Sequence, residues 1–295
     1  MKLLLPVILI FSIHYFPNLV RAEQSISVEW SRSEAYLEGQ SRRHFYEPET
    51  GTLYYSLALD ESWRLGASLW SGVADEVIGD LGHRLDQTHS GGSIYVNHML
   101  GNWGISVALS RARSELLVRS PASTLSYQEE TQSSDINFAF DYLFSFERLD
   151  FVPSLGLGFQ QSELEAEREL VVPGSIDIKD RKNEDQRGGY AFVGVDLNTW
   201  FELGREIFLL PAIQVGWSEA LSSDSHFSAS RHNLTQGSLR ALNLDGSGEL
   251  DDGSGYLGLS LALLIEGCQV RLSYTETLAQ DVNTASTGIE FGLSL

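Results

Sequence analysis

The C-terminal stretch of the chain decides the fold, and it reads Gly288-Ile289-Glu290-Phe291-Gly292-Leu293-Ser294-Leu295. Its apolar residues occupy every second position, and glycine, glutamate and serine fill the positions between them. Successive side chains of a β-strand point to opposite faces, so this alternation predicts a strand with one wholly apolar face. A strand of a soluble sandwich would show the same pattern, and the rest of the sequence has to separate the two cases.

The same alternation recurs along the chain and marks about twelve stretches. The predicted strands lie near residues 26–36, 53–60, 63–69, 92–100, 105–109, 136–144, 155–159, 193–198, 213–217, 257–263, 270–274 and 288–295. In lipid, only a closed barrel lets strands satisfy every backbone hydrogen bond. The sequence therefore predicts an all-β fold, a transmembrane antiparallel up-and-down β-barrel of about twelve strands.

The connections between the predicted strands alternate in length. Longer polar links alternate with short turns, which are expected near residues 60–62, 101–102, 147–150, 204–205 and 266–267. The longest link runs from residue 221 to 254. Short periplasmic turns and long external loops are typical of outer-membrane barrels. An even number of strands places both ends of the barrel on the side of the short turns.

Residues 1–22 have the features of a secretory signal peptide. A short positive start precedes an apolar run over residues 3–11, and residues 20–22 offer a cleavage site. The apolar run is short for a membrane span, which disfavours a retained anchor. We therefore expect cleavage after Ala22, a barrel formed by residues 23–295, and the cell outer membrane as the location.

Composition limits the partners. Cys268 is the only cysteine, so no intramolecular disulfide can form. The net charge is −20, and loss of Lys2 and Arg21 with the signal peptide leaves 18 basic against 40 acidic residues, a net charge of −22. Such acidity argues against nucleic acid as a partner and against docking on an anionic leaflet. The expected partners are outer-membrane lipid and lipopolysaccharide, and the barrel-assembly machinery during insertion.

Two stretches look familiar: Pro-Ser-Leu-Gly-Leu-Gly-Phe from Pro153 to Phe159, and the Gly-Ile-Glu-Phe-Gly-Leu-Ser-Leu ending. Together with the signal peptide and the amphipathic strands, they resemble the autotransporter-type and related twelve-stranded outer-membrane barrels of Gram-negative bacteria. The resemblance covers nearly all of the chain after the signal peptide. The chain departs from it at Leu295, where such barrels usually end on Phe, and in having no passenger. Secretion of a passenger is therefore not among the functions that the resemblance implies here.

Charged residues at inward strand positions are expected to line the lumen, because ionisable groups at membrane depth normally face a wet interior. They are Glu29, Asp60, Arg64, Asp135, Asp141, Asp196, Arg271 and Glu290. Such residues either pair across the barrel and brace it, or line a channel that selects ions or small solutes. Both alternatives stay open, and an open channel with this acidic lining would prefer cations.

The predicted role is a porin-like pore or a structural and surface barrel. The alternatives are a hydrolase of lipid or peptide with active residues in the external loops, and a receptor or adhesion surface built from those loops. A hydrolase needs a general base within hydrogen-bond reach of its nucleophile. His226 and Ser228, with Asp224 nearby, are close in sequence, but no complete triad or dyad is visible. No catalytic residue is therefore assigned.

One acidic stretch of the longest link has the spacing of a calcium loop. Oxygen-bearing side chains stand at alternate positions, namely Asn243, Asp245, Ser247, Glu249 and Asp251. With Gly248 sixth and Leu250 eighth, the stretch resembles the first nine positions of an EF-hand loop. Ser254 stands where the bidentate glutamate belongs, so an acidic, glycine-rich loop without metal is the alternative. Calcium is the only cofactor that the sequence suggests.

Overall fold

The structure is a computed structural model of the chain, and it describes residues 24–37, 49–60, 62–78, 83–119, 124–171, 178–221, 254–278 and 282–294. The strands are β1 Gln24–Leu37, β2 Glu49–Ala58, β3 Trp63–Ile78, β4 His83–Leu100, β5 Trp103–Arg119, β6 Thr124–Tyr142, β7 Phe144–Phe146, β8 Leu149–Val171, β9 Ile178–Thr199, β10 Phe201–Gly204, β11 Ile207–Ala220, β12 Ser254–Ile265, β13 Cys268–Leu278 and β14 Val282–Ser294. Within these ranges no helix is long and apolar enough to cross a membrane.

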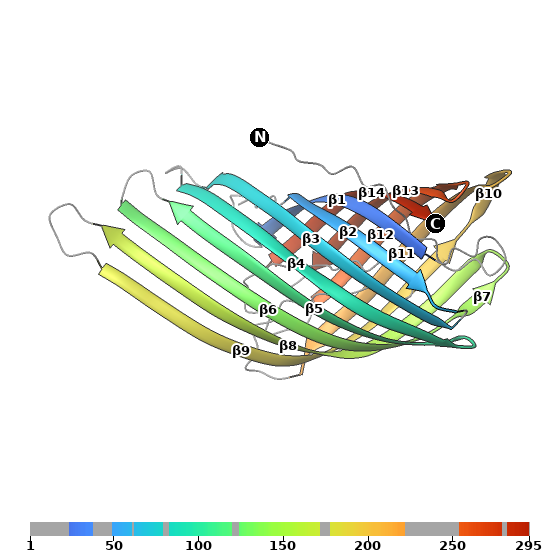
Figure 1. Ribbon diagram of the computed structural model, residues 1–295, viewed down its shortest axis with the longest axis horizontal. Coiled ribbons are helices and arrows are strands. Elements are labelled where there is room, and N and C mark those ends of the chain that lie inside the picture. Colours follow the sequence, from blue (N-terminus) through green and yellow to red (C-terminus); the bar gives the residue numbers. More distant parts are fainter. Residues whose placement is uncertain are drawn as a thin grey trace.

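Twelve of these strands close into one antiparallel barrel (Figure 1). Neighbours in the chain pair with each other, and β1 pairs with β14 to complete the ring. The short strands β7 and β10 pair only with β8 and β11, at the edge of the barrel. The predicted up-and-down barrel of twelve strands is therefore confirmed.

The outer surface of the barrel is apolar, because the alternation along each strand turns its large apolar side chains outward. In β2, for example, Tyr54 is buried whereas its neighbours Leu53 and Tyr55 are exposed. A soluble monomer rarely exposes so large an apolar surface, but lipid tails cover it in a membrane. We call this surface the apolar belt; each of the twelve strands contributes to it, through Trp30, Leu53, Leu69, Ile94, Leu109, Phe138, Leu155, Val193, Ile213, Leu261, Leu272 and Phe291.

Aromatic side chains gather at the end of the barrel that carries the short turns. Trp63 stacks on His98 with ring centroids 4.0 Å apart, and Trp103 meets Tyr142 edge-on at 4.7 Å. Phe144 adds a third contact, 4.5 Å from Tyr142. Aromatic residues concentrate at the interfaces of a bilayer. This girdle therefore marks the membrane boundary on the side of the short turns.

Both ends of the barrel sheet lie at this same boundary. Ser25, near the start of β1, pairs with Ser294 at the end of β14.

Two of the predicted short turns, at residues 101–102 and 266–267, use the left-handed backbone region: Gly101 has a φ of 64°, and Gly267 has a φ of 81°. Glycine adopts this region without the steric cost that other residues meet.

The prediction of long polar links is wrong for much of the chain. Leu170 pairs with Ile178, so the β8–β9 hairpin continues through residues that the sequence pattern assigns to a loop. β5 and β6 likewise pair from Trp103 to Arg119. The reason is that both faces of a strand meet water once it leaves the membrane. The apolar alternation then disappears although the hydrogen-bonded ladder continues.

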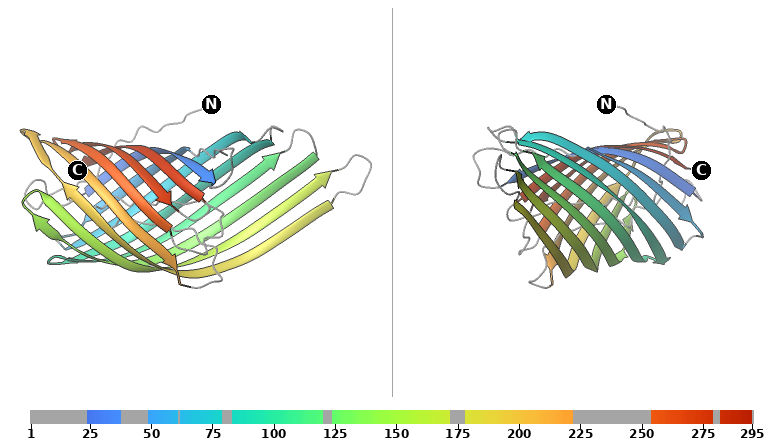
Figure 2. Two further views of the ribbon diagram at one scale, coloured as in Figure 1. Left: turned by 180° about the vertical axis from the view of Figure 1, so that it is seen from behind. Right: turned by 60° about the vertical axis from the view of Figure 1, so that its left-hand side comes forward.

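We call this polar extension of the sheet the wing; it comprises residues 110–119 of β5, 124–134 of β6, 160–171 of β8 and 178–189 of β9. The wing projects beyond the rest of the barrel at the end opposite to the short turns (Figure 1). β8 and β9 have 23 and 22 residues, whereas β12 and β13 have 12 and 11. Figure 2 shows this difference from behind, with the shorter β11–β14 in front of the long strands.

The apolar belt can be tested on one strand. Leu155 is exposed in the middle of the belt on β8, and Gln161 lies on the same face of β8 inside the wing. Leu155→Arg should lower the free energy of unfolding by about 2–4 kcal/mol, because a charge would meet lipid tails. Gln161→Arg should change it by only about 0–1 kcal/mol. Reversible unfolding from lipid vesicles measures both, and equal losses would contradict the placement of the belt in lipid.

Candidate functional site

The seam between β1 and β14 carries a row of buried charges on the inner wall. Glu29, Glu290 and Arg271 occupy adjacent register positions on β1, β14 and β13. Glu290 Oε2 lies 3.2 Å from Arg271 Nη1, and the two side chains are 2% and 10% exposed. The Tyr54 hydroxyl donates to Glu29 Oε2 at 2.8 Å, and the Ser273 hydroxyl donates to Glu29 Oε1 at 3.4 Å. One guanidinium and two hydroxyl groups thus stabilise two buried carboxylates.

A second group of carboxylates lies on β6 and β9. Asp135 accepts hydrogen bonds from the Tyr190 hydroxyl at 3.0 Å and from Asn137 Nδ2 at 3.2 Å. Asp141 and Asp196 are buried six positions further along the same two strands, where they interact electrostatically with each other. Six of the residues predicted to line the lumen are therefore buried on the inner wall, in these two groups.

The two other predicted lumen residues are placed differently. Arg64 is half-buried on β3, where it pairs in register with Ala58 and Asn97. Asp60 is not on the inner wall at all, because β2 ends before it and it lies exposed in the following turn. Its carboxylate accepts the backbone N–H groups of Ser62 at 2.7 Å and of Trp63 at 2.8 Å. These two hydrogen bonds lower the pKa of Asp60 below its ordinary value.

At several positions an aromatic ring of the inner wall lies over a glycine of the adjacent strand. A Cβ at Gly66 would overlap the ring of Tyr95, and a Cβ at Gly158 would overlap the ring of Tyr190. Each ring therefore lies with one side against the wall. Tyr95 and Tyr190 are nevertheless only 3% exposed, so the sides that face the lumen are covered too.

Tyr95 belongs to an apolar cluster inside the barrel. Tyr54, Tyr95, Ala108 and Ala139 are buried together, and Phe192 packs against them. The cluster extends from β2 to β9, which stand on opposite sides of the ring. The interior thus has an apolar core of its own.

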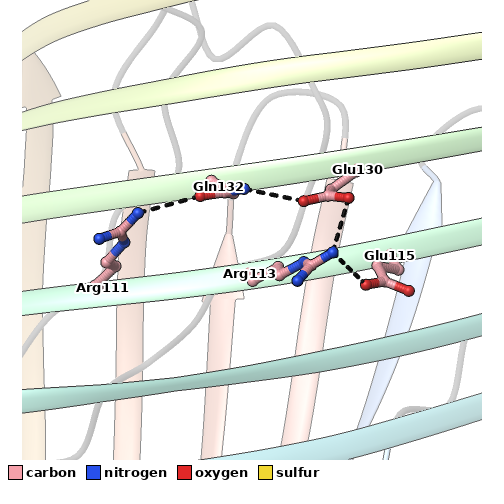
Figure 3. Close-up of polar contacts among 5 residues, drawn as sticks. All are labelled: Arg111, Arg113, Glu115, Glu130 and Gln132. Atoms are coloured by element: carbon pink, nitrogen blue, oxygen red, sulfur yellow. Dashed lines mark hydrogen bonds and ion pairs between the residues drawn. The ribbon is translucent and has the colours of Figure 1, made fainter.

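The outer face of the wing carries a polar network directly beyond the apolar belt (Figure 3). Arg113 Nη2 lies 2.8 Å from Glu115 Oε1 and 2.9 Å from Glu130 Oε2. Gln132 links this pair to Arg111: its Nε2 donates to Glu130 Oε1 at 3.0 Å, and its Oε1 accepts from Arg111 Nη2 at 3.2 Å. The hydrogen bonds from Gln132 and Arg113 lower the pKa of Glu130. Exposed pairs of this kind add little stability, so the network gives the wing a charged surface rather than a core.

Two described histidines have clear structural roles. His89 Nε2 shares a hydrogen bond with Thr50 Oγ1 at 2.8 Å, and His98 stacks on Trp63 in the aromatic girdle. His226 and Ser228 lie outside the described residues, as do the calcium-like stretch 243–251 and the predicted signal peptide 1–22. In the part of the chain that the structure covers, no three acidic, histidine or cysteine side chains gather as metal ligands.

The sequence analysis missed the partners of the inner carboxylates. Tyr54 and Tyr190 stand at inward positions, but an inward tyrosine alone does not show which acid it reaches. Tyr190 on β9 reaches Asp135 on β6 across the intervening strand β8. Only the register of three strands brings these two residues together.

The comparison with solved structures identifies the architecture. The structure is similar to the translocator domain of the autotransporter NalP from Neisseria meningitidis, with a TM-score of 0.68 and 10% identity over 94% of this chain and 90% of that one. It is also similar to the β domain of the Bordetella autotransporter BrkA, with a TM-score of 0.59 and 12% identity over 92% of this chain and 100% of that one. No protein-family model and no curated protein sequence matches the chain.

Closed barrel, apolar belt and aromatic girdle define an integral outer-membrane β-barrel protein. Its fold is that of the autotransporter barrels, which confirms the resemblance drawn from the sequence. At such low identity the similarity concerns the fold alone, and function has to be argued from the inner wall and the wing.

Proposed function

We propose that this protein is a surface barrel of a Gram-negative outer membrane whose lumen is closed, and that it acts through its wing rather than as an open pore. We also propose that residues 1–22 are a cleaved signal peptide. The proposed partners are outer-membrane lipid and lipopolysaccharide, and the barrel-assembly machinery during insertion. Of the roles that the sequence analysis left open, this proposal chooses the structural and surface barrel over the pore.

The aromatic cover of the inner wall carries the proposal. A water-filled channel would expose the lumen-facing sides of the rings of Tyr95 and Tyr190, yet both residues are 3% exposed. Trp70, whose ring a Cβ at Gly91 would overlap, is 5% exposed. The paired inner charges also support a closed lumen, because Glu290 pairs with Arg271 rather than facing a passing ion.

Conductance in planar lipid bilayers tests the proposal. The wild-type protein should insert without producing a steady ion current, because side chains fill the lumen at the level of the apolar cluster. Tyr95→Ala and Phe192→Ala remove parts of that cluster and should raise the frequency of channel openings. Tyr55→Ala, which shortens an exposed tyrosine on the outer face, is the matched control and should stay silent. A steady, cation-selective current through the wild-type protein would overturn the proposal in favour of a pore.

A further inference from the structure

Two arginines mark the level at which the outer face of the wing leaves the apolar belt. Side chains on one face of a sheet form rows across the strands, and the register gives the members of each row. The last apolar row consists of Leu109, Ile136, Phe159 and Gly189. The next row on the same face consists of Arg111, Ser134, Gln161 and Arg187, and we call it the arginine row.

The arginine row offers hydrogen-bond donors and contains no carboxylate. Arg111 is exposed, and the side chain of Arg187 is 62% exposed. Between them lie Ser134 and Gln161, two neutral side chains with a hydroxyl group and an amide group. Neighbouring strands are about 4.8 Å apart, so the two arginines start from backbones that are ~14 Å apart. The row is therefore a polar strip with a positive charge at each end.

Neither contact printed on the wing neutralises these two arginines strongly. Arg111 donates to the neutral side chain of Gln132 at 3.2 Å (Figure 3). Arg187 lies 3.7 Å from Asp185, and both side chains are more than half exposed, so this pair contributes little. Arg113, by contrast, lies within 2.9 Å of two carboxylates.

Most carboxylates on the outer face of the wing lie farther from the membrane than the arginine row. The two following rows are Arg113, Gln132, Glu163 and Asp185, and then Glu115, Glu130, Glu165 and Asn183. Successive rows on one face are ~7 Å apart, so the second of them is ~14 Å from the arginine row. Physiological salt largely screens exposed charges beyond about 8 Å. The acidity of the whole chain therefore does not decide which ligand the arginine row attracts.

We propose that the arginine row binds the phosphate groups of a lipid headgroup, and that the lipid is the phosphorylated glycolipid of the outer leaflet, lipopolysaccharide. The lipid anchor of this molecule, lipid A, is a disaccharide with a phosphate toward each end. A guanidinium group binds phosphate through parallel N–H donors, so Arg111 and Arg187 each take one phosphate. Ser134 and Gln161 then face the sugar hydroxyls between them. This proposal rests on the proposed function in that the wing lies on the side of the outer leaflet.

The apolar belt favours a lipid over a dissolved phosphate ion as the ligand. Leu109 and Phe159, in the row directly below, are 45% and 48% exposed. Acyl chains that pack against these side chains hold the attached headgroup at the level of the arginine row. A dissolved phosphate would gain only exposed ion pairs, which contribute little.

Titration with bisphosphorylated lipid A tests the proposal. In a nonionic detergent, native mass spectrometry resolves the folded protein with and without bound lipid. Arg111→Gln with Arg187→Gln should bind lipid A at least about tenfold more weakly than the wild type, because two charge-assisted contacts are lost. Arg148→Gln with Arg205→Gln is the matched control: it removes the same charge at exposed positions of the short turns. Its affinity should stay within about twofold of the wild type, because those turns lie beyond the screening distance. Equal affinities of the two double variants would overturn the proposal.

Other phosphate compounds test the choice of ligand in the same assay. Monophosphorylated lipid A and phosphatidylglycerol, each with a single phosphate, should bind the wild type more weakly than bisphosphorylated lipid A. Inorganic phosphate at millimolar concentration should not displace lipid A. If phosphatidylglycerol binds as tightly as lipid A, or inorganic phosphate displaces it, the row is a general anion site and the proposal is wrong.

Failure of this proposal can be told apart from failure of the proposed function. Conductance is recorded in bilayers of phosphatidylcholine, without lipid A, and the variants of the arginine row leave the inner wall intact. A conducting wild-type barrel would refute the closed lumen and leave the affinity for lipid A unchanged. Equal binding by the two double variants would refute the lipid site and leave the conductance unchanged.

Discussion

Replacement of Arg271 by methionine should lower the free energy of unfolding by about 3–5 kcal/mol, the usual cost of breaking a buried ion pair. Arg271 is the cation beside Glu290, at 3.2 Å, and no hydrogen-bond donor among the described residues reaches Glu290 Oε1. Removal of one partner of a buried ion pair leaves the other charge without compensation. The loss is aggravated by Glu29, which stands directly opposite Glu290 across the seam of the barrel. Unfolding of the protein in detergent by guanidinium, followed by tryptophan fluorescence, measures the change.

Two further variants show whether the loss comes from the uncompensated charge. The double variant Arg271→Met with Glu290→Leu replaces the whole pair by apolar groups and should recover most of the stability. Arg113→Met breaks the exposed pairs of the wing and should change the unfolding free energy very little. If the double variant is as unstable as Arg271→Met alone, packing around Arg271 is what matters, and the electrostatic explanation is wrong.

Tyr54→Ala should destabilise the barrel by about 3–5 kcal/mol, since it removes a buried ring from the apolar cluster of the lumen. Its neighbour Tyr55 provides the control, because it has the same side chain on the same strand but points outward and is 36% exposed. Tyr55→Ala should cost much less, since the ring is not enclosed by other side chains. Equilibrium unfolding of the two variants under identical conditions gives the comparison.

Tyr54→Phe separates the hydroxyl from the ring. The hydroxyl donates to Glu29 Oε2 at 2.8 Å, and a hydrogen bond to a charged group contributes about 1.5–3 kcal/mol. We therefore expect an intermediate loss for Tyr54→Phe. If Tyr54→Ala and Tyr55→Ala lose the same stability, the lumen holds no packed core and the proposal of a closed barrel loses its main support.

The sequence analysis found the strands within the membrane because each of them separates two environments. Large apolar residues occupy the even-numbered positions from 136 to 144, and the structure places this stretch in the last part of β6 and the start of β7. The sequence analysis did not predict the strands of the wing, because both of their faces meet water and no apolar alternation marks them. Asp180 illustrates this: it lies in β9, although the local sequence suggests a polar loop.

The inner charges show where a linear pattern stops being informative. Alternation alone marks Glu29, Arg271 and Glu290 as inward residues, but it assigns no partners. Arg271 faces Glu290 because of the register between β13 and β14, and Glu29 joins them because the first and last strands pair. A shift of one residue would turn every one of these side chains to the opposite face.

By itself, the sequence determined that this chain crosses a membrane as a β-barrel, which side of each strand meets lipid and at which end the short turns lie. These features depend on whether each face of a strand meets lipid or water. That environment selects the residue types of each strand, so a short stretch of sequence is enough to show them. Tertiary structure decided that Tyr54 and Tyr95 are buried in one apolar cluster inside the barrel, that Arg271 pairs with Glu290, and that Tyr190 reaches Asp135. Each of these depends on residues far apart in the chain becoming neighbours through register and ring closure, which no local pattern records.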